Sequence, residues 1–358
     1  MKAFKRQEHS VPSYYPWFDW LRGVLAVTVM LAHEGVLQWS KAGPFAVEVF
    51  FALSGWLIGG VLLGTSRENL PRFFFNRSVR IWVPYYIALA LLLAVSLLRD
   101  PFTLKWAEFA LYKLTFVYNL FGTQQLATFG HQMPLGGTGN HFWSVNAEEQ
   151  FYLVAPLALV LLARRFGRST LLWTLCAAVA WTVGGYASIV FGVCAAVIAS
   201  NHPGVLSDGR TRAALGLAGL IGVAGLAAGL PYERLAPVVA ICIVLVLAVK
   251  GAQKRLGVLV GGMSYPLYLN HWIGVFVAHA AMRPFGLRES PLSHLLSFVF
   301  NIALAVGLYV YIERPLLQRR SAWYTPQLGR CAAVAAYAML SCGLLLGIGF
   351  LVAGTGRV

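Results

Sequence analysis

Long apolar runs separated by short basic segments dominate the chain. A transmembrane helix needs about 20 apolar residues to cross roughly 30 Å of hydrocarbon. Eleven runs reach or approach this length, which predicts an all-α, polytopic bundle of about eleven spans. They cover residues 17–39, 44–64, 80–98, 147–164, 169–183, 185–200, 213–230, 235–250, 263–282, 292–313 and 331–353. The fifth and sixth are separate only if Gly184-Gly185 forms a turn.

The segments between the runs suggest a simple organisation. We expect a tail over residues 1–16, a membrane core over 17–315, and a linker with one extra span over 316–358. Residues 99–146 form the longest connection. Their weakly apolar piece, 106–121, is expected to lie on the membrane surface or to pack over the bundle. We find no internal repeat or separate soluble domain.

The composition excludes an ordinary soluble domain. Hydrophobic residues make up 58% of the 358 residues and charged residues 11%, whereas soluble domains carry about a quarter charged residues. The five cysteines lie inside apolar runs and none has the spacing of a zinc site. We therefore expect buried thiols, with no metal and no disulfide.

The net charge of +15 reflects membrane topology. With the N-terminus inside, 19 of the 28 Lys and Arg residues fall in inside segments and 8 in outside segments. This is the distribution of the positive-inside rule, so we expect no nucleic-acid partner. Merging the fifth and sixth runs would put later basic loops in different compartments. Eleven spans therefore fit best, with the N-terminus cytoplasmic and the C-terminus outside.

Ionisable residues inside an apolar run usually serve a function. The first run carries Asp19, Arg22 and His33. Arg22 and His33 are eleven residues apart, almost three helical turns, so both lie on one face about 16 Å apart along the axis. They could snorkel to opposite membrane boundaries. The functional alternative is a polar track in which Arg22 meets an anion and His33 acts as a general base.

Other polar residues lie near the ends of the runs. Glu48 lies at the same end as His33 and could contact it. Arg72, Arg77 and Arg80 form a basic cluster that suits phosphate, although the positive-inside rule alone could explain it. Ser54 is expected to serve packing.

A second polar group precedes and opens the fourth run. Glu148 and Glu149 exceed what capping of a helix start requires, and we place them at the outer boundary. His141, on the preceding loop, is expected to be solvated. Tyr268 and His271 put polar groups inside the ninth run, beside Pro266.

Five stretches in order resemble motifs of the acyltransferase-3 family of membrane acyltransferases. They are residues 18–23 followed by His33 after an Arg-x10-His spacing, and residues 50–58, 77–85, 143–152 and 265–271. Asn146, Ala147, Pro266 and Asn270 depart from the family patterns. The resemblance covers nearly the whole chain. It implies a core of ten spans, so the run after Pro315 lies outside the motifs.

The resemblance also implies roles. The catalytic set would be His33, Arg22, Glu48, Glu148 and Glu149. The donor-binding set would be Arg22, Arg72, Arg77, Arg80 and Tyr85. Polar residues on the acceptor side, or with a structural role, would be Asp19, Ser54, Trp143, Ser144, Gln150, Tyr152, Tyr268 and His271. No cofactor would be bound, and acyl-CoA would be a co-substrate.

The resulting hypothesis is an O-acyltransferase of a bacterial-type inner membrane. It would move an acyl group, acetyl on the family's precedent, from cytoplasmic acyl-CoA to a hydroxyl of an extracytoplasmic glycan or glycolipid. His33 would carry the acyl group covalently or move only a proton, and both stay open. The alternatives are a carrier or flippase for an anionic substrate or glycolipid, and an acyltransferase for a lipid or small metabolite.

Overall fold

The computed structural model describes residues 14–161 and 166–353, and within them the chain is helical with no β-strand. Its α-helices are α1 (Pro16–His33), α2 (Ala42–Leu63), α3 (Leu70–Leu97), α4 (Leu104–Leu114), α5 (Tyr118–Phe121), α6 (Leu126–Phe129), α7 (Trp143–Pro156), α8 (Thr170–Val183), α9 (Ala187–Asn201), α10 (Gly209–Ala227), α11 (Tyr232–Leu247), α12 (Arg255–Met282), α13 (Pro291–Leu308), α14 (Arg314–Trp323) and α15 (Pro326–Val352). Short 3₁₀ and π-helical segments join or extend them: η1 (Arg67–Asn69), η2 (Thr123–Gln125), η3 (Gly130–Gln132), η4 (Pro134–Phe142), η5 (Leu157–Leu161), η6 (Arg283–Phe285) and η7 (Tyr309–Glu313).

Several of these helices can cross a bilayer. Five helical stretches are long and apolar enough: Ala42–Leu63, Arg67–Leu97, Gly209–Ala227, Pro291–Trp323 and Pro326–Val352. The helices α8 and α9 are apolar but shorter. The chain is therefore a multi-pass helical membrane protein. Each of the eleven predicted ranges contains a helix, while the number of spans stays a prediction.

The structure describes most of the basic residues in the charge count. Six basic residues used in the charge count lie outside the described residues, namely Lys2, Lys5, Arg6, Arg164, Arg165 and Arg357. The orientation of the termini therefore stays a prediction.

Three helix boundaries bear on the sequence analysis. The predicted turn at Gly184-Gly185 is confirmed, because both glycines have positive φ and separate α8 from α9. The first helix ends at His33, six residues earlier than predicted, because the chain turns at Gly35 with φ of 71°. The third begins at Leu70, ten residues earlier than predicted, with Pro71 in its first turn. The basic segment before residue 80 is therefore helical.

The helix α2 lies at the centre of the bundle. Two thirds of the most apolar stretch of α2 is buried, whereas 17% of the corresponding stretch of α15 is buried. It packs against α1, α7, α9 and α11. Its contact with α9 is close because Gly55 of α2 faces the backbone of Gly192 on α9. Small residues let helix backbones approach in this way.

We expect replacement of Gly55 by alanine to destabilise the protein. An added Cβ would lie 2.1 Å from the carbonyl oxygen of Ile189, so α2 and α9 must move apart. Overpacking of this kind costs about 1–3 kcal/mol. The measurement is the thermal unfolding midpoint of the detergent-purified variant, which should fall.

Gly60 provides the matched control on the same helix. A Cβ there meets nothing within 4 Å, so Gly60→Ala should leave the midpoint unchanged or raise it slightly through better helix propensity. Equal midpoints for the two variants would contradict the proposed tight contact.

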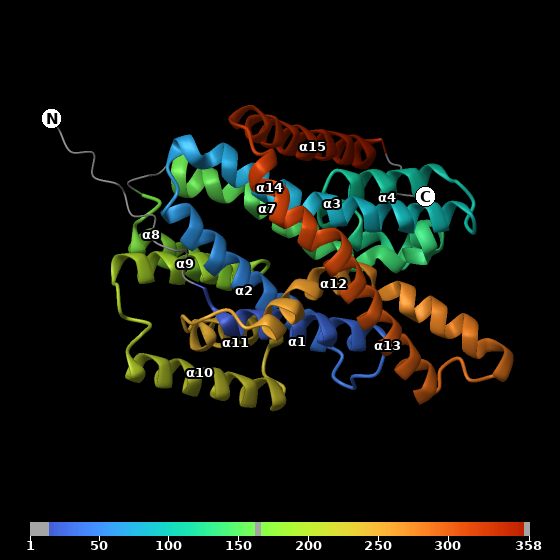
Figure 1. Cartoon of the computed structure of the whole chain (residues 1–358), viewed down its shortest axis with the longest axis horizontal. Helices are drawn as coiled ribbons and strands as arrows, with labels where there is room; N and C mark the ends of the chain where they lie inside the picture. Colours follow the sequence, from blue (N-terminus) through green and yellow to red (C-terminus); the bar gives the residue numbers. More distant parts are fainter. Residues whose placement is uncertain (1–13, 162–165, 354–358) are drawn as a thin grey trace.

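The long connection between α3 and α7 folds over the bundle. The helix α4 buries Phe109 and Tyr112 in a hydrophobic cluster that includes Tyr118 and Met133. The helix α15 packs along α3 and α4 on one edge of the molecule, and α10 forms the opposite edge (Figure 1). Packing over the bundle, one of the two predicted placements of residues 106–121, is therefore what the structure shows.

The segment after α13, which includes the predicted linker, is helical. It continues through η7 into α14, which packs against α3. The helix α15 then crosses the start of α3, where Gly329 lies against the carbonyl of Pro71. Both helices beyond residue 313 are thus packed on the core.

Candidate active site

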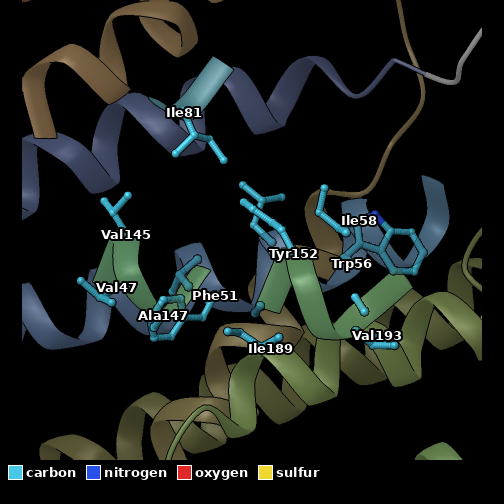
Figure 2. Close-up of a cluster of buried hydrophobic side chains, with 14 of the residues drawn as sticks. Val47, Phe51, Trp56, Ile58, Ile81, Val145, Ala147, Tyr152, Ile189 and Val193 are labelled. Carbon is cyan, nitrogen blue, oxygen red and sulfur yellow. The ribbon is translucent and has the colours of Figure 1, made fainter. Parts of the chain in front are cut away.

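A cavity of about 150 Å³ lies among α1, α2, α3, α7 and α12. Its apolar walls come from the buried cluster in Figure 2, including Val47, Ile58, Ile81 and Val145. Its polar lining consists of Arg22, Ser54, Arg77, Arg80, Ser144, Glu148, Tyr152, Ser264, Tyr265 and Tyr268. Residues from all five of the family-like stretches therefore meet at this cavity, and Arg22 is the residue that the first stretch contributes.

Three arginines give the cavity a positive character. Arg22 comes from α1, and Arg77 and Arg80 come from the early turns of α3. The guanidinium of Arg22 interacts electrostatically with those of Arg77 and Arg80. Its carboxylate partner is Asp19, 3.7 Å away, which also accepts a hydrogen bond from Tyr14. Among the described residues, Arg77 and Arg80 form no ion pair. Such a cluster suits an anionic ligand.

The other two predicted donor residues lie outside the cavity lining. Arg72 stacks over the ring of Tyr324, 5.3 Å from its centroid. Tyr85 is fully buried, where its hydroxyl donates to the carbonyl of Lys113 at 2.8 Å and accepts from Asn146 at 3.0 Å. Its bonds therefore fix the connection between α3 and α7, away from the arginines.

The carboxylates do not gather at one outer surface. Glu148 lines the cavity with the arginines and accepts hydrogen bonds from Ser54 and Tyr152. This differs from the predicted outer-boundary position, because α7 begins at Trp143 inside the folded-over segment and carries Glu148 into the bundle. Ser54 thus meets a site residue in addition to packing.

The other two acids point elsewhere. Glu149 accepts a hydrogen bond from the indole of Trp82 at 2.8 Å and faces α3. Glu48 accepts one from Ser188 on α9. The contact between Glu48 and His33 considered from the sequence is therefore replaced by other partners for both residues.

His33 pairs with His271. Nδ1 of His33 lies 2.9 Å from Nε2 of His271, and the rings stack 5.0 Å apart. Nδ1 of His271 lies 2.9 Å from the carbonyl of Tyr268, which can only accept, so we assign the proton of neutral His271 to Nδ1. His33 then donates from Nδ1 to His271. His33 is exposed, and no other described residue donates to its Nε2, whose lone pair is therefore free.

Tyr268 connects the cavity to the histidines. It lines the cavity, and its hydroxyl lies 2.5 Å from Ser144 and donates to the carbonyl of His141 at 2.8 Å. Its own carbonyl orients His271. The ring of Phe50 packs edge-on against it. Tyr268 therefore lies between the arginine-lined cavity and the histidine pair.

The expectation that His141 is solvated is wrong. It is 4% exposed, its ring lies 4.6 Å from that of His271, and its Nε2 lies 3.2 Å from the carbonyl of Leu269. The reason is that η4 tucks into the bundle between α3 and α12. Among the described residues, no three His, Cys, Asp or Glu side chains are arranged to hold a metal ion.

Two predicted polar residues hold α7 in place. Gln150 donates to the carbonyl of Phe116 at 2.7 Å and bonds Asn119. Trp143 packs edge-on against Phe51 at 5.8 Å. These contacts fasten the folded-over segment to α7 and α2.

The structure adds supporting residues that the sequence analysis missed. Asn301 on α13 donates to the carbonyl of His271 at 2.8 Å and accepts from the amide of Gly274. Ser297 donates to Glu34, the neighbour of His33, at 2.7 Å. The signal was a polar residue every fourth position, Ser293, Ser297 and Asn301, in an otherwise apolar helix.

Comparison with known families matches residues 15–310 to the model described as an acyltransferase domain, that of the acyltransferase-3 family. The chain belongs to this family. The matched residues include the whole cavity lining and the three clustered histidines. In this member, α14 and α15 lie beyond the matched residues.

Curated relatives of this acyltransferase-3 chain are named as O-acetyltransferases. The O-acetyltransferase OatA of Staphylococcus aureus is 29% identical over 180 residues, which are 49% of this chain and 30% of that protein. The peptidoglycan O-acetyltransferase OatA of Listeria monocytogenes is 31% identical over 166 residues, 44% of this chain and 26% of that protein. The chain thus matches under a third of these relatives' length. No solved structure matches it significantly.

Proposed function

We propose that the protein is a membrane O-acyltransferase that transfers an acetyl group from acetyl-CoA to a hydroxyl of a carbohydrate across the membrane. The observation that carries the proposal is the cavity lined by Arg22, Arg77 and Arg80, which reaches Tyr268 beside the His33–His271 pair. Anion-binding groups and a potential base thus lie on the two sides of one site.

The cavity suits an acyl-CoA donor in its chemistry. Guanidinium groups bind phosphate oxygens through paired hydrogen bonds. The apolar walls formed by residues such as Phe50, Leu57 and Ile58 suit a thioester arm. The arm would run past Tyr268 toward His33, with the nucleotide at the arginine end.

The His33–His271 arrangement supports a base-assisted transfer. The acceptor oxygen attacks the thioester carbonyl carbon, and Nε2 of His33 takes the hydroxyl proton. The new C–O bond forms as the C–S bond breaks, and the leaving thiolate receives the proton. The products are an ester and free CoA. The hydrogen bond from His33 to His271 stabilises the charged imidazolium.

The acceptor is proposed from the relatives and the charge pattern. OatA of Listeria monocytogenes is named for peptidoglycan, which supports a glycan or its lipid-linked precursor as acceptor. The basic inside loops support a bacterial-type inner membrane, with the arginine end toward the cytoplasm. The histidine pair, at the other end of α1, would face the acceptor.

The test uses purified full-length protein in lipid nanodiscs with acetyl-CoA labelled in the acetyl group. We expect saturable donor binding, and release of free CoA matched by acetate esters on added peptidoglycan or lipopolysaccharide fragments. Esters on added phospholipid instead would favour the lipid alternative. Absence of both acetyl-CoA binding and ester formation would overturn the proposal and favour the carrier.

A further inference from the structure

The helix α14 adds a basic surface next to the arginine end of the cavity. It packs against α3 (Figure 1). Its C-terminal neighbour Tyr324 contacts Phe75 at 5.6 Å between ring centroids and lies under the guanidinium of Arg72. These contacts fix α14 beside the first turns of α3, although it lies outside the residues matched to the family.

Arg320 on α14 extends the arginine cluster. Its half-buried guanidinium interacts electrostatically with those of Arg72 and Arg80, and Arg77 also experiences its charge. Among the described residues, Arg72, Arg80 and Arg320 form no ion pair. The adjacent Arg319 is exposed.

Nearby acids balance the inner part of the cluster better than the outer part. Asp19 pairs with Arg22, and Glu148 lies in the cavity. Glu313 is buried and interacts electrostatically with Arg80. Arg320, by contrast, is repelled by the like-charged Arg72 and Arg80. Like charges held close together are costly, and Arg72 and Arg320 form no ion pair among the described residues, so this outer group favours an added anion.

We propose that Arg320, together with Arg72 and Arg80, binds the ribose 3′-phosphate of coenzyme A. This inference rests on the proposed function. Of the arginines that line the cavity, Arg22 and Arg77 suit the pyrophosphate next to the thioester arm, and Arg80 interacts electrostatically with both Arg22 and Arg320. Arg72 and Arg320 lie outside that lining. The phosphate farthest along the donor from the thioester is the ribose 3′-phosphate, so it matches this outer group.

The test compares acetyl-CoA with acetyl-3′-dephospho-CoA in the transfer assay. Wild-type protein should have a lower KM for acetyl-CoA. Arg320→Gln should raise the KM for acetyl-CoA about tenfold, the effect of losing one charge-assisted hydrogen bond. Its KM for the dephospho donor and its kcat should stay unchanged. Arg320→Lys should restore part of the preference.

Arg319→Gln is the matched control, since it removes a neighbouring charge from the exposed face of α14. It should keep the wild-type preference. An equal loss in Arg319→Gln, or an unchanged preference in Arg320→Gln, would overturn the inference. If Arg320→Gln is not recovered folded, Arg72→Gln replaces it, with the same expected loss of preference and the same overturning result.

The failure of this inference is separable from failure of the proposed function. Wild-type turnover of both donors with equal KM would overturn the 3′-phosphate site and leave the acyltransferase intact. Failure of wild-type protein to bind or use either donor would reject the acyltransferase itself.

Discussion

Replacing His33 with alanine is expected to lower acetyl transfer about 10²- to 10⁴-fold, the usual contribution of a general base. The expected loss lies in kcat, because His33 does not line the arginine-rich cavity and should contribute little to donor binding. The variant removes the His33 Nε2 that the assigned hydrogen bonds leave free to take the acceptor proton. The measurement is ester formation on the glycan fragments alongside acetyl-CoA affinity.

The control for this variant is His202→Gln. His202 is exposed after α9 and lies away from the histidine cluster. The His202→Gln protein should therefore transfer acetyl groups at the wild-type rate. Full activity in a correctly folded His33→Ala protein would contradict the proposed role of His33 and the mechanism built on it.

Replacing Arg22 with glutamine is expected to weaken donor binding strongly. Arg22 lines the cavity, and a hydrogen bond to a charged group contributes about 1.5–3 kcal/mol, equivalent to roughly a 10- to 100-fold rise in KM for acetyl-CoA. Asp19 keeps its hydrogen bond from Tyr14 in the variant, which limits the structural damage. Steady-state kinetics and direct donor binding to the nanodisc-embedded protein measure the effect.

Arg210→Gln tests whether charge alone explains such a change. Arg210 is exposed at the start of α10, remote in the fold from the cavity helices. Its KM should match that of wild type. A similar rise in both variants would point to general electrostatic attraction instead of a specific Arg22 contact.

The fold was predictable where apolar runs are long and uninterrupted. The break at Gly184-Gly185 was also predictable, because paired glycines readily adopt positive φ. The early start of α3 was missed because Arg72, Arg77 and Arg80 interrupt the apolar run. Arginine is nonetheless a good helix former, and Pro71 is a typical first-turn residue.

The site was predictable only in part, for a physical reason. Arg22, Arg77 and Arg80 meet at the cavity because the short connections before and after α2 reverse the chain direction twice. The beginnings of α1 and α3 therefore lie at the same end of the bundle. The positions of Glu148 and His141 depend on how the connection before α7 folds back into the bundle. That folding is set by long-range contacts, such as the hydrogen bond from Asn146 to Tyr85, which spacing along the chain does not reveal.

The helix α1 sets the distance between the arginine end and the histidine end of the site. Gly23 of α1 lies against Val260 of α12, and Gly261 of α12 lies against Asp19 of α1, so the two helices pack closely. Arg22 and His33 both lie on α1, so the helix itself holds them about 16 Å apart along its axis. A donor gripped at its phosphate by Arg22 reaches His33 only through a long arm. Acetyl phosphate, whose carbonyl and phosphate share a single oxygen, is too short to span that distance. We therefore expect the site to select its acyl donor by length as well as by charge.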